Sequence, residues 1–139
     1  MATLTTEERI ALAKYRIERA KTTLIEAVDN AGFGHWNLVA NRLYYAVFHA
    51  LNALIAIDGD AVKTHKGLIS LIGLHYVNSG VIKTEDNKLI MRLFRMRQTA
   101  DYDVYCDWNK EDVSPLIEKV KLLLDKIENI SNQKIDNLS

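Results

Sequence analysis

A stripe of polar side chains runs along an otherwise apolar stretch of this 139-residue chain. Arg42, Tyr45, His49 and Asn52 recur at steps of three and four residues, so a helix places them on one face. A polar group inside a protein costs free energy unless it finds a hydrogen-bond partner. The stripe therefore has two interpretations: a satisfied buried network, or one wall of a cleft that binds a ligand or RNA and faces a later helix.

A second stripe begins at Arg97, which Asp101 and Tyr105 follow at four-residue steps, with Tyr102 one position further round. An arginine holds phosphate through bidentate hydrogen bonds. A neighbouring carboxylate can orient that arginine or accept a proton. The alternative is an ion pair within one helix, with the tyrosines packed beside it.

Charge changes sign along this second region. Arg92, Arg95 and Arg97 place three guanidinium groups within six residues, and mainly acidic residues follow. Such a run is either a solvated face or a basic strip for RNA phosphates or an acidic partner. The 18 basic and 18 acidic residues of the whole chain cancel, which leaves room for a local patch.

Several classes of site are disfavoured by the sequence. The four histidines show no three- or four-residue spacing, and the single cysteine, Cys106, cannot form an intramolecular disulfide. We therefore expect no metal and no cofactor. His65 lies between Lys63 and Lys66, where it is either a helix-cap residue or an anion contact. Without an apolar run of about 18–20 residues or a signal peptide, we expect a cytoplasmic protein without a membrane partner.

The elements that must position these residues are helices. The chain has one proline, and its apolar residues recur at helical spacing. We predict an all-α, antiparallel up-and-down bundle of about five helices in one domain, residues 1–139, with residues 131–139 as a frayed tail. The expected helices span residues 6–30, 36–57, 64–78, 84–106, and from 110 or 115 to 130.

Three segments carry a resemblance to a known family. The stretches Asn41–Leu54, Lys63–Leu68 and Arg95–Tyr102 resemble the HEPN domain superfamily, most of all its small stand-alone bacterial and archaeal proteins. The resemblance implies a bundle of four or five helices that dimerises. Many such proteins are metal-independent endoribonucleases, and several are toxins encoded beside a minimal nucleotidyltransferase that acts as antitoxin.

The active-site motif of that superfamily is carried over residue by residue. Arg97 matches the motif arginine and Gln98 the polar residue after it. The motif histidine is expected four to six residues beyond the arginine, where this chain has Asp101 and Tyr102 instead. Arg42 and Tyr45 match positions that commonly accompany the motif.

The resemblance and the stripes together give one leading hypothesis and two alternatives. The leading one is a homodimer that forms one half of a toxin–antitoxin-like pair with a minimal nucleotidyltransferase and binds nucleotide or RNA in a cleft between subunits. The alternatives are a metal-independent ribonuclease and a helical interaction module without chemistry. The candidate catalytic residues are Arg97, Asp101 and Tyr102. The candidate nucleotide- or RNA-binding residues are Arg42, Tyr45, His49, Arg92, Arg95, Gln98 and Tyr105.

Overall fold

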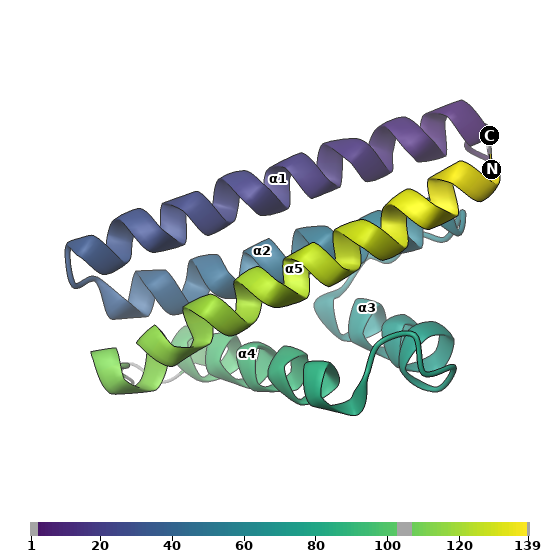
Figure 1. Ribbon diagram of the computed structural model, residues 1–139. Coiled ribbons are helices and arrows are strands. Elements are labelled where there is room, and N and C mark those ends of the chain that lie inside the picture. The colour runs from purple at the N-terminus through teal and green to yellow at the C-terminus, as the bar shows by residue number, and fades with distance from the viewer. Residues whose placement is uncertain (1–2, 103–106, 139) are drawn as a thin grey trace.

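The computed structural model describes residues 3–102 and 107–138, without the side chains of residues 100–102. Within that part of the chain the elements are α1 (Thr6–Gly32), α2 (Trp36–Ile57), α3 (His65–Ile72), the π-helical turn η1 (Gly73–Val77), α4 (Thr84–Tyr102) and α5 (Lys110–Leu138). The long helices α1, α2, α4 and α5 alternate in direction along the chain, and the short α3 lies beside them (Figure 1). The predicted all-α up-and-down bundle is confirmed.

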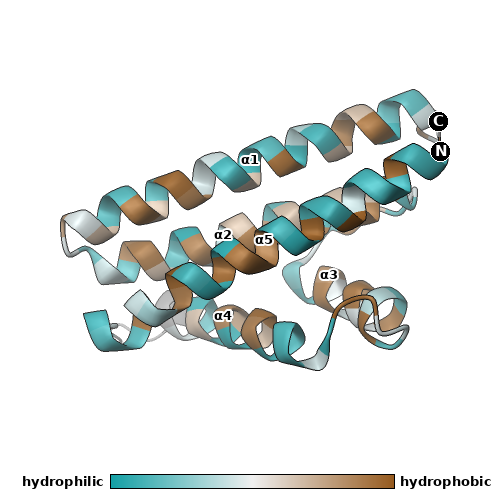
Figure 2. Ribbon diagram, in the orientation of Figure 1, coloured by the Kyte–Doolittle hydropathy of each residue, from teal (hydrophilic) through white to brown (hydrophobic). Residues whose placement is uncertain are grey.

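Helix α2 lies at the centre of the bundle. It packs against each of the other four α-helices, and most of its side chains are buried. Its colouring by hydropathy is largely apolar, whereas α1 and α5 alternate between apolar and polar turns (Figure 2). A helix that is apolar nearly all round is stable only inside a protein. The sequence of α2 thus places it in the core, and any polar side chain on it needs a partner.

Helix α1 starts where its sequence predicts. The Thr5 side chain accepts a hydrogen bond from the backbone of Glu8, and the Glu8 carboxylate accepts one from the Thr5 backbone. This reciprocal cap satisfies two backbone donors that a helix end otherwise leaves unpaired. The helix ends two residues later than the predicted Asn30. Gly34, at φ +74°, makes the turn into α2 in a backbone region that suits glycine.

The third predicted helix, residues 64–78, is divided in the structure. Thr64 caps α3 by accepting a hydrogen bond from Gly67, and the regular helix ends at Ile72. The chain then widens into η1 before the turn that contains Gly80. The predicted fourth helix begins at Thr84 as expected, and its last residues, 103–106, lie outside the described part of the chain.

The last helix is longer than predicted. Asn109 and Asp112 cap its start reciprocally, and Pro115 lies inside it. The expectation of a frayed tail is wrong for residues 131–138, which are helical. Ser131 is buried there, and Lys134 pairs with Asp58 at 2.9 Å. These contacts hold the polar end of α5 against the α2–α3 connection. They join residues far apart in the sequence, so the local pattern of residues 131–139 does not predict them.

None of the helices within residues 3–102 and 107–138 has the combination of length and hydropathy that crossing a bilayer requires.

Candidate functional site

The guanidinium group of Arg97 lies against two tyrosines of α2. Its Nε–H donates a hydrogen bond to the Tyr45 hydroxyl at 3.3 Å. Its Cζ atom lies 5.6 Å from the centre of the Tyr44 ring and 5.9 Å from that of Tyr45. A cation within about 6 Å of an aromatic ring face is attracted by the ring quadrupole. The structure thus brings together two of the predicted site residues, Arg97 of α4 and Tyr45 of α2, and fixes the direction of the arginine.

His65, at the start of α3, completes this group. Its Nδ1 atom lies 2.5 Å from the Tyr44 hydroxyl oxygen, and its ring stacks on Phe48 with a centroid distance of 4.5 Å. Its ring is also 5.8 Å from Tyr45 in an edge-on arrangement. We call Tyr44, Tyr45, Phe48, His65 and Arg97 the Arg97 cluster. It combines a permanent cation from α4, an imidazole from α3 and three aromatic rings from α2.

Tyr44 is the most buried member of the cluster, at 3% exposure, and burial raises its pKa above the ordinary value of a phenol. The positive charge of Arg97 acts in the opposite direction but more weakly. Tyr44 therefore stays protonated at neutral pH. It can donate its hydrogen to the imidazole of His65, which places the proton of a neutral His65 on Nε2.

Arg42 also lies near Tyr45, with its Cζ atom 5.4 Å from the ring centre. The Asn41 side-chain oxygen accepts two hydrogen bonds from its guanidinium group, at 3.1 and 2.7 Å. Its Nη1 atom is 3.7 Å from the carboxylate of Glu26 on α1. Arg42 is thus held between α1 and α2, and both Arg42 and Arg97 lie within 6 Å of the Tyr45 ring centre.

His49 faces α1 and lies away from α4. Its Nδ1 atom is 3.1 Å from the guanidinium of Arg16. Burial lowers the pKa of His49 to about 4, and the positive charges of Arg16, Arg19 and Arg42 add to the effect. His49 is therefore neutral at pH 7, and its Nδ1 accepts the hydrogen bond. Asn52, the last residue of the predicted stripe, donates to the Phe48 carbonyl within its own helix.

The stripe on α2 is thus divided between two neighbours. Tyr45 reaches Arg97 of α4, whereas His49 and Arg42 contact α1. The reason is that α2 packs against several helices. Residues at different positions along its length therefore contact different neighbouring helices.

Of the other predicted residues in this region, Arg92, Arg95 and Gln98 have described side chains, and none of the three makes a described contact with the cluster. Arg95 and Gln98 are exposed. Arg92 lines a groove of about 340 Å³ between α4 and α5, together with Lys119 and Lys126. The side chains of Asp101 and Tyr102, and all of Tyr105, lie outside the described residues.

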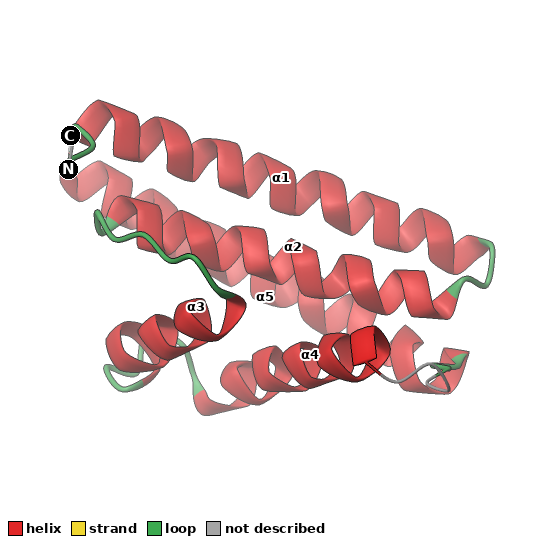
Figure 3. Cartoon of the chain, turned by 180° about the vertical axis from the view of Figure 1, so that it is seen from behind, coloured by secondary structure: helices red, strands yellow, loops and turns green. Residues whose placement is uncertain are grey.

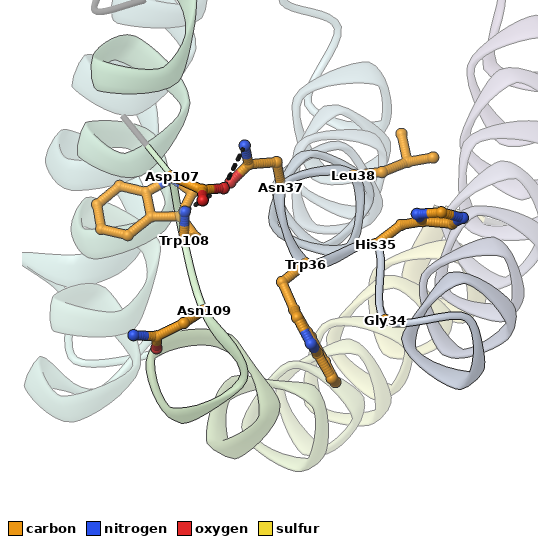
Figure 4. A pocket seen from close by; sticks show the side chains of 8 residues that line it. All are labelled: Gly34, His35, Trp36, Asn37, Leu38, Asp107, Trp108 and Asn109. Carbon is orange, nitrogen blue, oxygen red and sulfur yellow. Dashed lines mark hydrogen bonds between the residues drawn. The ribbon is translucent and has the colours of Figure 1, made fainter. Parts of the chain in front are cut away.

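A further hollow lies away from this cluster. A cavity of about 670 Å³ lies between residues 34–38 and residues 107–109 (Figure 4). Asn37 connects its two sides: its amide donates to the Asp107 carboxylate at 3.3 Å, and its oxygen accepts from the Trp108 backbone at 2.6 Å. None of the predicted site residues with described side chains lines this cavity, so we place the candidate site at the Arg97 cluster.

Sequence reasoning missed three members of the cluster. Tyr44 and Phe48 look like core residues, and His65 was considered only as a cap or an anion contact beside two lysines. The one signal in the sequence is a histidine at the start of a helix. That position does not predict which other helix the histidine will contact. Within residues 3–102 and 107–138, no three His, Cys, Asp or Glu side chains are grouped to hold a metal ion.

The arrangement suits the recognition of a phosphate or a nucleobase. Arg97 supplies charge-assisted donors for a phosphate oxygen. Half-buried rings such as Tyr45 and Phe48 offer surfaces on which bases stack. His65 adds an imidazole, the side chain that most often serves as a general acid or base.

Comparison with known proteins places these residues in a family context. The family model of the HEPN domain matches residues 13–130. A UPF0332 protein of Thermotoga maritima is 28% identical over 123 residues, which cover 88% of this chain and 93% of the relative. Two proteins of Methanocaldococcus jannaschii are named as candidate toxins. One is 26% identical over 110 residues, covering 79% of this chain and 75% of the relative. The other is 31% identical over 87 residues, which cover 63% of this chain and 64% of the relative.

Proposed function

The chain belongs to the HEPN domain family, and on that premise we propose that it is a toxin-like protein that binds nucleotide or RNA at the Arg97 cluster. It acts as a homodimer, with the ligand in the cleft between two subunits, and a nucleotidyltransferase is its protein partner. The observation that carries the proposal is the contact of Arg97 with Tyr45. The motif arginine lies against the rings of Tyr44 and Tyr45 and donates a hydrogen bond to the Tyr45 hydroxyl, which directs a side chain of the type that binds anions.

The names of two relatives support the toxin-like assignment. One candidate toxin matches 79% of this chain and the other matches 63%. A fold alone does not define an activity. The argument therefore depends on the site, where an arginine motif position and its tyrosine partner are both present.

Binding is tested with purified protein and a fluorescently labelled single-stranded RNA. Arg97→Gln removes the charge and should weaken binding at least tenfold, whereas Arg95→Gln, on the exposed side of the same helix, should change it less than threefold. Circular dichroism and urea unfolding check that both variants are folded. Equal binding by all three proteins would contradict the assignment of the ligand to Arg97.

The protein partners are tested separately. The mass of the particle in solution, measured by light scattering, should be that of two chains. Co-expression with a nucleotidyltransferase encoded beside the gene should yield a complex, or a mass increase on Tyr102 or Tyr105. A monomer that neither binds the transferase nor is modified, and that does not bind RNA, would leave the interaction module as the better description.

A second candidate function, a metal-independent endoribonuclease, is favoured by the position of His65. The family motif places a histidine on the same helix as the arginine, and this chain has none there. The fold nevertheless brings an imidazole from α3 to the same two tyrosines that hold Arg97. In such a reaction the ribose 2′-oxygen loses its proton and bonds to phosphorus, and the bond to the 5′-oxygen breaks as that oxygen gains a proton. Arg97 would stabilise the charge on phosphorus, and His65 or Asp101 would move a proton.

Cleavage is measured in EDTA, with wild type, Arg97→Ala and His65→Gln at equal concentrations. Loss of cleavage in both variants supports this function with His65 as the proton carrier. Loss in Arg97→Ala alone assigns the proton to another group, such as Asp101. Cleavage by every variant indicates contamination. If the wild type does not cleave RNA, the endoribonuclease function is rejected and the proposal of a nucleotide- or RNA-binding protein remains.

A further inference from the structure

Three arginines surround one neutral histidine on the face formed by α1 and α2, outside the Arg97 cluster. Arg16 is 3.1 Å from His49 Nδ1. Arg19 and Arg42 are close enough to act on the charge of the same imidazole. We call Arg16, Arg19 and Arg42 the arginine triad. All three are half-buried, so they are partly removed from the water that usually screens such a group of like charges.

Little negative charge offsets the triad. The only carboxylate within ion-pair distance of it, in the described part of the chain, is that of Glu26, which is 3.7 Å from Arg42. Arg19 makes no side-chain hydrogen bond or ion pair with any described residue. Arg16 donates to a histidine that carries no charge at pH 7. Among the described residues the triad therefore sets three positive charges against one carboxylate, an arrangement that an anion would stabilise.

The triad is continuous with the Arg97 cluster through Tyr45. Arg42 approaches the Tyr45 ring at 5.4 Å and Arg97 approaches it at 5.9 Å. The rings of Phe48 and His65 lie beside Tyr45 in the cluster. From the side opposite α5, α1 and α2 are seen together with α3 and α4 beneath them (Figure 3). The Tyr45 ring is thus the group that the triad and the Arg97 cluster have in common.

We propose that the arginine triad is a second phosphate-binding site, which holds the backbone of a single-stranded RNA whose neighbouring nucleotide occupies the Arg97 cluster. The inference rests on the proposed function, because it extends the ligand at Arg97 from one nucleotide to a strand. Guanidinium groups match phosphate oxygens in geometry and charge. A cationic track interleaved with aromatic rings is how proteins hold single strands without reading their sequence.

The experiment measures the salt dependence of RNA binding. Each phosphate contact contributes about 0.7 to the slope of log K against log salt for a single strand. An oligouridine of about ten nucleotides, within the length that one such face covers, is titrated with wild type and with Arg16→Gln/Arg19→Gln. The double variant should bind at least tenfold more weakly, and its slope should fall by about 0.7 to 1.4.

A control variant removes the same net charge from another helix. Lys110→Gln/Lys121→Gln changes two exposed lysines of α5. This control should bind within threefold of the wild type and keep its slope. If the triad variant and the control behave alike, the triad is not a phosphate site and the inference is overturned. Urea unfolding of both variants verifies that the folds are intact.

The two proposals fail differently. If Arg97→Gln weakens RNA binding and the triad variant does not, the proposed function stands and the second site falls. If the wild type does not bind RNA at all, both fall. If the triad variant loses binding while Arg97→Gln keeps it, RNA binds on α1 and α2 without the Arg97 cluster. The proposed function then fails, and with it the inference that one strand spans both sites.

A readout at the site itself is the titration of His49. A bound phosphate offsets the charges of the triad, so the pKa of His49 should rise from about 4 towards its ordinary value when the oligouridine is added, as followed by NMR. Inorganic phosphate is titrated in parallel. Should phosphate shift His49 while the oligouridine does not, the site takes a free anion and the RNA assignment is overturned. An unchanged pKa with saturating RNA overturns it as well.

Discussion

The hydroxyl oxygen of Tyr44 lies 2.5 Å from Nδ1 of His65, and this contact joins α2 to α3 beside Arg97. The two rings also stack, with centroids 5.5 Å apart. Residues 21 positions apart in the sequence thus form one unit. The hydrogen bond fixes the orientation of an imidazole that would otherwise rotate at the start of a short helix.

Removing that hydroxyl should lower stability. Tyr44→Phe leaves Nδ1 of His65 without this partner, and we expect the free energy of unfolding to fall by about 1–2 kcal/mol. Urea unfolding at pH 7.5 measures the change. Tyr45→Phe is the matched control, because its hydroxyl accepts a longer bond of 3.3 Å and is less buried. A loss for Tyr45→Phe as large as that for Tyr44→Phe would contradict the prediction.

His49 should make the protein less stable in acid. Its pKa is about 4 in the folded chain against an ordinary value of 6.5, so the unfolded chain binds the proton more tightly. The contribution of neutral His49 to the free energy of unfolding is fully present above pH 6.5 and is lost as the pH falls from 6.5 to 4. With allowance for solvent screening of a half-buried group, we expect a loss of about 1–2 kcal/mol.

This pH dependence is checked by urea unfolding between pH 7 and pH 4 for wild type and His49→Gln. The variant cannot take up the proton, so its stability should fall less over that interval. His35→Gln is the control, since His35 is exposed and precedes α2. Parallel curves for wild type and His49→Gln would show that His49 is not the group responsible.

Asn37 should control the segment that leads into α5. Its side chain makes both hydrogen bonds to Asp107 and Trp108 across the cavity of Figure 4. Asn37→Ala should speed the hydrogen exchange of the Trp108 amide at least tenfold while reducing the free energy of unfolding by only about 0.5–1.5 kcal/mol. Leu38→Ala changes the same cavity wall without a hydrogen bond and should leave that exchange unaltered. Equal exchange in the two variants would refute the assignment.

Asp58 should anchor the end of α5. Its carboxylate accepts a hydrogen bond from Tyr76 at 2.6 Å and pairs with Lys134 at 2.9 Å. Burial, with the hydrogen bond to Asp58, raises the pKa of Tyr76, so the phenol remains a donor. Asp58→Ala should cost about 1–3 kcal/mol, because it leaves a buried hydroxyl without its acceptor.

The check for Asp58 is urea unfolding combined with hydrogen exchange of residues 131–138. Those amides should exchange faster in Asp58→Ala, whereas Asp60→Ala, two residues further along the loop, should leave them protected. Protection that persists in Asp58→Ala would mean that packing alone holds this end of the helix.

Local signals in the sequence located most of the helices. The cap at Thr5, the glycine turn at Gly34 and the apolar spacing of α2 each depend on residues within a few positions of one another. The arginine of the candidate site was identified in the same way, from the motif around Arg97. The length of α5 was underestimated because its stabilising partner, Asp58, comes from the other half of the chain.

The sequence by itself determined the all-α class, the order of the helices and the choice of Arg97 and Tyr45, since helical periodicity and a local motif are short-range properties. Only the tertiary structure decided that His65 lies beside Tyr44 and that His49 faces Arg16 rather than α4. Those pairings depend on how a buried central helix divides its circumference among its neighbours. That division is set by the packing of side chains distant in sequence, which spacing along one helix cannot specify.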